Sequence, residues 1–420
     1  MNPLRQKIEN EIRERGPIPF SRYMEMCLYH PELGYYARHA EQFGKAGDFY
    51  TSSDVHAVFG RLLARQFEEM WRVLGSPQQI ELMELGPGRG LFAQDVLDWS
   101  EKKFPDFFRA LRYILIESSP ALRQRIEATL RPHLESGKAE LNSFIRMQPD
   151  PASAPRSAAE RRKTAAHGAS RGSGMVENEP APQGRKKFSP IAPSVPTILF
   201  ANEFFDALPV EILSPQGSLR IDARDGRFLE TWAPPSIEEM EFLDRYSVHP
   251  QPHERIEIQL AAQQFMHRIH LHRGFFIAID YGYTRDEQLA GRHRGTLKAI
   301  RQHSVSANPY EAPGEQDITA DVNFTALSAA AEGRGMQVQK VVTQSQFLMG
   351  IGEANQFADA FEACHLPQER AKVALQLKHL VTPAGMGESF HVLVTSKGIE
   401  KEKAAALAGL SFGGASHTLK

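Results

Sequence analysis

Short apolar runs alternate with amphipathic helical patterns along most of the chain, and this alternation predicts an α/β fold. Strands that are joined by helices in this way lie parallel and are connected by right-handed crossovers. The last two strands suit an antiparallel hairpin at one edge of the sheet. The predicted strands cover residues 79–83, 111–116, 141–145, 197–201, 274–279, 337–342 and 390–395.

The same patterns divide the 420-residue chain into three parts. Residues 1–76 are expected to form a helical extension, which includes an amphipathic helix over 3–15 and a longer one over 54–74. Residues 77–396 contain all the predicted strands of the sheet. Excursions are expected at 207–253 and 284–325, with a helix at 254–272 between them, and the Ala-, Gly- and Lys-rich residues 397–420 are expected to form a flexible tail.

Residues 148–195 differ from the rest in composition, because Ala, Pro, Ser, Gly and Arg dominate and large apolar side chains are scarce. Such a segment buries too little surface to offset the entropy lost on ordering. We therefore expect a disordered basic insertion. It is either a solvated linker, which the composition favours, or a basic tether for RNA or an acidic partner.

Composition limits the classes of function. The formal net charge is −2, which gives no general case for a nucleic-acid partner. No apolar run reaches the roughly 18 residues of a membrane span, and the N-terminus carries neither a secretory nor a transit-peptide pattern. The two cysteines form no metal-binding motif and suit a reducing compartment. We expect a cytoplasmic protein without a metal site, and a homodimer is compatible with the sequence.

A glycine-rich turn follows the first predicted strand, at the position where the carboxyl edge of an α/β sheet binds ligands. Its sequence is Glu84-Leu-Gly86-Pro87-Gly88-Arg-Gly90. The dinucleotide fingerprint would place its third glycine at Leu91, and a P-loop would require Gly-Lys followed by Ser or Thr, which is absent. The turn therefore excludes a P-loop and disfavours NAD or FAD.

Two acidic residues point to a different cofactor. Glu84 ends the first strand and could anchor an ammonium group, whereas Glu117 ends the second strand and could accept hydrogen bonds from two ribose hydroxyls. S-adenosylmethionine carries ribose, ammonium and carboxylate groups but no phosphate, and fits this pair. The alternative is that both acids are ordinary surface residues beside a tight turn.

The turn also resembles motif I of class I methyltransferases, and the stretch Ala201-Asn-Glu-Phe-Phe-Asp-Ala-Leu-Pro-Val210 resembles the MidA family of these enzymes much more specifically. Asn323 and His391 depart from the family pattern, which usually has an acid and a lysine at these positions. The resemblance covers nearly the whole chain apart from the basic insertion and the tail. Further similar stretches, in order, are 47–52, 117–123, 279–282, 295–297 with His303, 313–319, 343–348 and 386–387.

This resemblance implies a Rossmann-like class I fold with a mostly parallel seven-stranded sheet and S-adenosyl-L-methionine as cofactor. It also implies a protein arginine N-methyltransferase, because a mitochondrial relative methylates an arginine of a respiratory complex I subunit and assists complex I assembly. A loop containing Asp48, Tyr50 and Thr51 would fold over the cofactor as a lid. The residues expected to bind the cofactor are Glu84, Gly86, Pro87, Gly88, Gly90, Glu117, Ser118, Asn202 and Thr51.

The methyl acceptor is expected at the exit of the fourth strand. A protonated arginine needs carboxylates to orient its guanidinium, and Glu203 and Asp206 have a spacing that lets them face one pocket. Together with Asn202 they are the predicted catalytic residues, although Asp206 could instead cap the following turn. Asp280 and Tyr281 are expected to line the same cleft.

Two other functions remain open on the sequence. The first keeps the fold and cofactor but uses a small-molecule acceptor; a nucleic-acid acceptor is disfavoured, because the Asn/Asp-Pro-Pro-aromatic signature of base methyltransferases is absent after the fourth strand. The second is a non-catalytic assembly or interaction factor. The acceptor, the type of methylation and any role of His303 and the 295–324 loop do not follow from the sequence.

Overall fold

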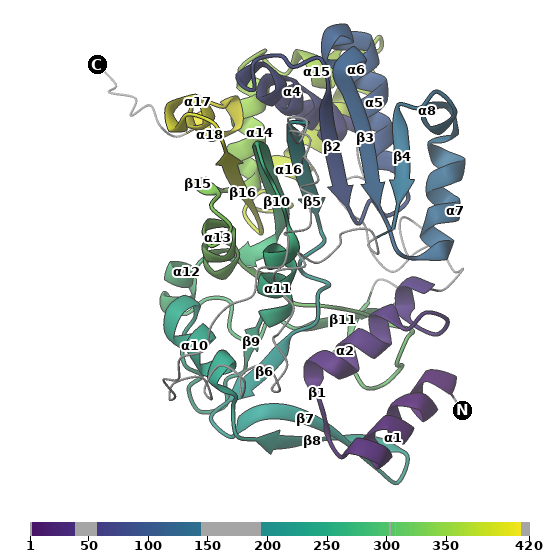
Figure 1. Ribbon diagram of the computed structural model, residues 1–420, viewed down its shortest axis with the longest axis vertical. Helices are drawn as coiled ribbons and strands as arrows, with labels where there is room; N and C mark the ends of the chain where they lie inside the picture. The colour runs from purple at the N-terminus through teal and green to yellow at the C-terminus, as the bar shows by residue number, and fades with distance from the viewer. Residues whose placement is uncertain (1, 38–56, 144–194, 302–303, 307, 413–420) are drawn as a thin grey trace, which may run out of the picture. The chain divides into compact units, whose positions relative to one another are not determined.

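The computed structural model describes residues 2–37, 57–143, 195–301, 304–306 and 308–412 (Figure 1). The described residues all fall in one compact unit. The predicted insertion at 148–195 lies outside the described residues apart from Val195, and so do Asp48, Tyr50 and Thr51 of the predicted lid.

A central sheet has the strand order β15-β16-β10-β5-β2-β3-β4 (Figure 1). The short strand β14 pairs with β10 beside this path. Strands β10, β5, β2, β3 and β4 are parallel to one another, whereas β16 is antiparallel to both β10 and β15. The prediction of an α/β fold with a mostly parallel sheet is confirmed. The strands are β2 (Ile80–Leu85), β3 (Leu111–Ile116), β4 (Ala139–Asn142), β5 (Thr197–Asn202), β10 (Gly274–Tyr283), β14 (Val322–Asn323), β15 (Gln337–Thr343) and β16 (Phe390–Lys397).

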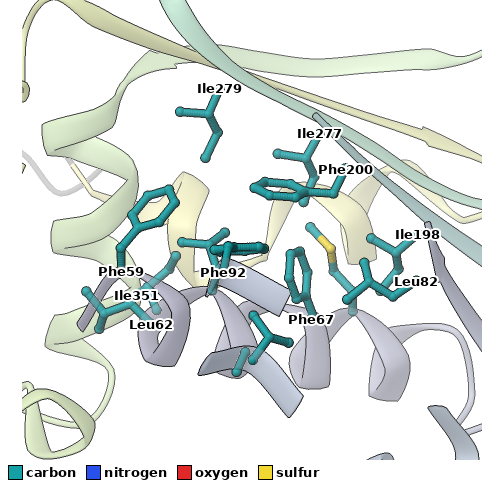
Figure 2. Packing of buried hydrophobic residues seen from close by; sticks show 14 of the residues in the cluster. Phe59, Leu62, Phe67, Leu82, Phe92, Ile198, Phe200, Ile277, Ile279 and Ile351 are labelled. Atoms are coloured by element: carbon teal, nitrogen blue, oxygen red, sulfur yellow. The ribbon is translucent and has the colours of Figure 1, made fainter. Parts of the chain in front are cut away.

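Helices α4 (Ala57–Val73), α5 (Leu91–Lys103) and α14 (Gln344–Glu353) contribute to the apolar core on one face of this sheet (Figure 2). Phe92 of α5 stacks on Phe200 of β5 with ring centroids 4.7 Å apart, and Phe67 of α4 meets the same ring edge-on at 5.4 Å. Burying each of these rings contributes about 2 kcal/mol. The stripe on α4 therefore serves packing, as its spacing predicts.

The other face of the sheet is covered by α11 (Leu260–Arg268) and α13 (Phe324–Glu332), whose apolar residues pack with Leu199, Phe276 and Leu393. Strands β3 and β4 are connected through two helices. The remaining helices of this part are α6 (Pro105–Ala110), α7 (Pro120–Thr129), α8 (Arg131–Glu135), α15 (Ala358–Phe361) and α16 (Pro367–Val381).

The structure differs from the sequence-based expectation in two places. The third strand, β4, ends at Asn142, where the sequence predicted 141–145. The helix predicted over 254–272 is divided into β9 (Ile256–Ile258) and α11, because Ile256 and Ile258 are buried in an antiparallel pairing with β6. The antiparallel pair predicted for the last two strands is confirmed at one edge of the sheet, where β15 is the outermost strand and β16 lies between β15 and β10.

A second, antiparallel sheet has the order β1-β7-β6-β9, with β8 paired to β7. Its first strand comes from the N-terminal region, so the predicted extension 1–76 is divided between two sheets: α1, β1 and α2 adjoin the second sheet, whereas α4 packs on the central one. The elements are α1 (Pro3–Arg15), β1 (Ile18–Pro19), α2 (Phe20–Tyr29), η1 (Tyr35–Ala37), β6 (Glu211–Ser214), β7 (Gly217–Arg224), β8 (Arg227–Ala233) and α10 (Ile237–Tyr246).

A small third sheet, of order β12-β11-β13, comes from the excursion predicted at 284–325. Its strand β13 carries Asp317 and pairs with β11 through Ile300. Asn323, which departs from the family pattern, is fully buried and caps α13 by accepting the N–H of Ala326 at 2.9 Å. The elements are α12 (Arg285–Leu289), β11 (Lys298–Arg301), β12 (Ser304–Ser306) and β13 (Asp317–Thr319).

Within the described residues, the tail that was predicted to be flexible from residue 397 onward is folded. It forms α17 (Lys401–Ala405) and α18 (Ala408–Ser411), and Ala404 and Leu407 are buried in the core that contains α4. Gln66 and Glu69 of α4 accept hydrogen bonds from the backbone N–H groups of Gly409 and Ala408. The packing of these helices was not predicted from the sequence. Alanine and glycine allow close contact with α4, but they do not form the pattern of large apolar residues that indicates a buried helix.

Candidate active site

The glycine-rich turn joins β2 to α5 through three residues with left-handed backbone angles. Gly86, Gly88 and Gly90 have φ values of 63°, 55° and 79°, a region that is favourable for glycine and costly for other residues. The backbone N–H of Gly90 donates to the carbonyl of Pro87 at 2.8 Å and closes the turn.

The three glycines have different surroundings. A Cβ atom on Gly86 would lie 2.9 Å from Cδ2 of Phe204, and one on Gly90 would lie 3.3 Å from Cδ1 of Leu130. A Cβ on Gly88 would meet no atom within 4 Å among the described residues. Gly90 was predicted to bind the cofactor, but it does not line the cavity beside the turn. Its N–H is used within the turn, and a Cβ atom on it would point toward Ile126 of α7 and Leu130.

A cavity of about 400 Å³ opens beside this turn. It is bounded by the carboxyl ends of β2, β3 and β5, by α2 and η1 from the N-terminal region, and by β13. The carboxyl edge of a parallel sheet is where ligands bind in such folds. The predicted site residues that line this cavity are Glu84, Gly86, Pro87, Gly88, Glu117, Ser118, Asn202, Glu203 and Asp206.

Glu84 is a buried carboxyl group beneath the turn, with 4% of its surface exposed. Burial raises its pKa to about 8, and the Tyr113 hydroxyl, which donates to Oε2 at 2.8 Å, acts in the opposite direction. Tyr113 was not identified from the sequence, because a tyrosine inside a buried strand has the pattern of core packing. A cation in the cavity would favour the carboxylate form of Glu84.

Glu117 follows β3 and is held by the backbone after it. The N–H of Ser119 donates to Oε1 at 2.7 Å, while burial raises the pKa of Glu117 to about 7. Ser119 caps α7 and also donates its hydroxyl to the carbonyl oxygen of Tyr36 at 2.6 Å. The segment that carries Glu117 is thus fixed to the N-terminal region.

The exit of β5 places two polar residues in the cavity. Glu203 has a φ of 49°, an uncommon left-handed conformation for a residue with a side chain, and its N–H donates to the carbonyl of Ile279. Strain of this kind is concentrated at functional sites. Asn202 donates to Glu203 Oε1 at 3.1 Å, whereas its own Oδ1 is buried and has no hydrogen-bond partner among the described residues.

Asp280 does not line the cavity, contrary to the sequence-based expectation, and neither does Tyr281. Asp280 is fully buried behind the loop, and its Oδ2 accepts the backbone N–H groups of Phe204, Phe205 and Asp206 at 3.1, 2.8 and 3.3 Å. The side chain therefore turns toward the backbone and fixes the loop that carries both predicted catalytic acids.

Asp206 reaches the same cavity as Glu203 and is 8% exposed. Burial raises the pKa of Asp206 to about 7, and the carboxylate of Asp321 adds to the increase. Its carbonyl oxygen accepts the N–H of Ala320 at 3.0 Å, which ties this loop to the residues that follow β13. The backbone N–H of Ala207 also stabilises its carboxylate, so Asp206 lines the cavity and caps its own turn.

The residues that line the cavity but were not predicted as site residues include Tyr29, Tyr36, Asp317 and Thr319. The Tyr29 hydroxyl donates to the carbonyl of Ala207 at 2.9 Å, and the Tyr36 hydroxyl donates to Asp317 Oδ1 at 3.1 Å. The aromatic stretch near Tyr36 and the motif at 317–319 were visible in the sequence. Their proximity to the strand ends was not, because it depends on distant parts of the chain.

The residues of the cavity fit S-adenosylmethionine. Glu84 would hold its ammonium group, Glu117 its ribose hydroxyls, and the turn from Gly86 to Gly88 leaves the backbone accessible. The unpartnered Asn202 Oδ1 supplies one more acceptor at this wall. Thr51 and His303 lie outside the described residues. The fold and the cavity together define a Rossmann-like methyltransferase.

Comparison with known proteins identifies the family. Residues 62–342 match the model of the family described as "Putative S-adenosyl-L-methionine-dependent methyltransferase", and the chain belongs to this family. It is an S-adenosylmethionine-dependent methyltransferase. The resemblance found in the sequence is confirmed.

Two relatives and one solved structure extend this result. The "Protein arginine methyltransferase NDUFAF7 homolog, mitochondrial" of Drosophila melanogaster is 29% identical, with 94% of this chain and 85% of that protein covered. The Homo sapiens protein arginine methyltransferase NDUFAF7 is 25% identical, with 93% and 82% covered. A likely methyl transferase from Burkholderia thailandensis, solved with S-adenosyl-homocysteine, is 26% identical and has a TM-score of 0.73, with 99% and 96% covered.

Proposed function

We propose that this protein transfers a methyl group to a guanidinium nitrogen of an arginine in a protein substrate. One observation carries the proposal: Glu203 and Asp206, from the exit of β5, line the same cavity as Glu84 and Glu117. The first pair would bind the acceptor, and the second pair would bind the cofactor.

The chemistry of arginine supports these roles. A guanidinium stays protonated in proteins and presents several N–H donors in one plane, so carboxylates bind and orient it well. Glu203 and Asp206 lie on the loop that Asp280 fixes through hydrogen bonds to its backbone. Because this loop is already fixed, less entropy is lost when the acceptor binds. A lysine ammonium is a compact point charge and lacks the planar set of N–H donors that two carboxylates can bind.

The cofactor supplies an activated methyl group on its sulfonium. As the new N–CH₃ bond forms and the S–CH₃ bond breaks, the guanidinium nitrogen loses one proton. Asp206 is suited to accept this proton, because its pKa is raised to about 7 by burial. The proton then passes to solvent, and the methylated guanidinium remains a cation.

The names of the relatives support a protein arginine acceptor, since both are protein arginine methyltransferases. The family resemblance adds a respiratory complex I subunit as a candidate acceptor. Within the described part of the chain, every helix is too short or too polar to cross a membrane. A cytoplasmic location stays a prediction, which fractionation of cells would test.

The experiment compares protein methylation in cells that lack this gene and in cells that carry it again. Heavy-methyl methionine labels new methyl groups, and mass spectrometry locates them. We expect one or a few arginine marks to disappear and return. Glu203→Gln and Asp206→Asn should not restore them, whereas the exposed Glu238→Gln should. Marks confined to lysine, or to small molecules, would contradict the proposal.

A further inference from the structure

A carboxylate outside the central sheet completes the acceptor side of the cavity. Asp317 lies on β13 of the small third sheet, where it pairs with Ile300 of β11, and only 1% of its surface is exposed. It lines the same cavity as Glu203 and Asp206. The bond from the Ala320 N–H to the Asp206 carbonyl holds the two segments together at 3.0 Å.

Tyr36 fixes the position of Asp317. Its hydroxyl donates to Asp317 Oδ1 at 3.1 Å, and its carbonyl oxygen accepts the hydroxyl of Ser119 at 2.6 Å. Ser119 in turn donates its N–H to Glu117. One residue of η1 therefore connects the acid that would bind the ribose to the acid on β13.

Two aromatic rings complete this wall. Tyr29 and Tyr36 line the cavity with ring centroids 5.5 Å apart and planes inclined at 32°. Both hydroxyls are engaged, that of Tyr29 with the Ala207 carbonyl, so the rings are held in place. The face of a tyrosine ring attracts a cation, and guanidinium groups stack on such faces.

We propose that Asp317 and the rings of Tyr29 and Tyr36 form, with Glu203 and Asp206, the subsite that selects a guanidinium as methyl acceptor. This inference rests on the proposed arginine methylation. Carboxylates from two separate segments bind the N–H groups of the acceptor, while the rings contact its flat face. Tyr36 has a second role as a positioning residue, since it orients Asp317.

The test uses the full-length protein loaded with S-adenosylhomocysteine and three probes: acetyl-arginine amide, acetyl-lysine amide and acetyl-citrulline amide. Citrulline has nearly the shape of arginine but no charge. Calorimetry or NMR titration gives each dissociation constant. We expect the wild-type protein to bind the arginine probe at least tenfold more tightly than either other probe.

Asp317→Asn should weaken binding of the arginine probe about tenfold and leave binding of the citrulline probe unchanged. Tyr36→Phe, which retains the ring, should weaken arginine binding about threefold, and Tyr36→Leu should weaken it more. The matched control is Glu315→Gln, because Glu315 is on the same segment, pairs with Arg301 and does not line the cavity. Affinity for S-adenosylhomocysteine should stay within twofold in Asp317→Asn, which separates this role from misfolding.

Two results would overturn the inference: an Asp317→Asn protein that binds both the cofactor product and the arginine probe like the wild type, or a wild type that does not prefer arginine to citrulline. The proposed function is judged separately, by the loss of arginine marks in cells without the gene. If Asp317→Asn restores those marks at the wild-type rate, the subsite assignment fails while arginine methylation stands.

Discussion

Asp280 accepts a hydrogen bond from the backbone N–H of Phe205 at 2.8 Å, although 75 positions separate them in the chain. The same Oδ2 accepts the N–H groups of the residues on either side. Asp280 pairs with His391 at the register between β10 and β16, so the carboxylate stands on a strand that is fixed on both sides. The central sheet therefore controls the loop that carries Glu203 and Asp206.

Asp280→Ala should lower the free energy of unfolding by about 3 kcal/mol, because it leaves buried N–H groups without an acceptor. Burial, with the carboxylates of Asp206 and Glu203 nearby, raises the pKa of Asp280. Asp280→Asn should therefore lower the free energy of unfolding less than Asp280→Ala, since the amide oxygen of asparagine can still accept hydrogen bonds from these backbone N–H groups. Chemical denaturation checks both variants, and an Ala variant as stable as the wild type would contradict this role.

Affinity for S-adenosylhomocysteine should increase as the pH rises from 6 to 8. The pKa of Glu84 is raised by burial to about 8, and only its carboxylate form binds an ammonium group well. Tyr113→Phe removes the hydrogen bond that lowers this pKa, so the rise should move to higher pH. Titration calorimetry across this range checks the shift, and Glu84→Gln should have a weaker pH dependence.

Without cofactor, the Glu84→Gln variant should be more stable than the wild-type protein at pH 8, and the two should be about equally stable at pH 5. Since the folded protein holds a proton on Glu84 up to about pH 8 and the unfolded chain loses it near 4.5, the folded state binds more protons in this window. Glu84 therefore lowers the free energy of unfolding as the pH rises from 4.5 to 8, by up to about 4 kcal/mol. Thermal melts at both pH values, with Glu238→Gln as control, measure the difference; a less stable Glu84→Gln at pH 8 would contradict it.

Substitution of the turn glycines should separate folding from binding. Gly86→Ala places a Cβ 2.9 Å from the Phe204 ring and should destabilise the protein as well as disturb the Glu203 loop. Gly88→Ala meets no described atom within 4 Å and costs only backbone strain of about 1 kcal/mol. We expect Gly88→Ala to fold and to bind the cofactor more weakly. Melting temperature and calorimetry together distinguish the two effects.

Leu407→Ala should destabilise the protein by about 3 kcal/mol, because Leu407 is 1% exposed in the core that includes α4. A substitution at the exposed Glu402 on the preceding helix is the matched control. If both variants unfold at the temperature of the wild type, the C-terminal helices do not contribute to the core.

The sequence was sufficient for the elements whose signal is local. The apolar run of β3 matches the predicted strand residue for residue, and the exits of β2, β3 and β5 bring Glu84, Glu117 and Glu203 to one edge. This works because parallel strands present their carboxyl ends together.

Other features depend on contacts between distant segments. Tyr36 and Asp317 are 281 positions apart, and no periodicity connects them. Asp280 was expected to line the cleft because it ends a predicted parallel strand, but its carboxylate faces the backbone of a neighbouring loop instead. The residues of β9 were predicted to be helical, because so short an apolar pattern fits both a helix and a strand. The pairing with β6, which is distant in the sequence, determines that they form a strand.

The position of β16 has a consequence for biosynthesis. This strand, residues 390–397, is inserted between β15 and β10, so one edge of β10 stays unpaired until nearly four hundred residues have left the ribosome. An open apolar strand edge can pair with other chains. A nascent chain with β2, β3 and β5 already assembled would therefore be prone to aggregation, and a chaperone that shields β10 would increase the yield of folded enzyme.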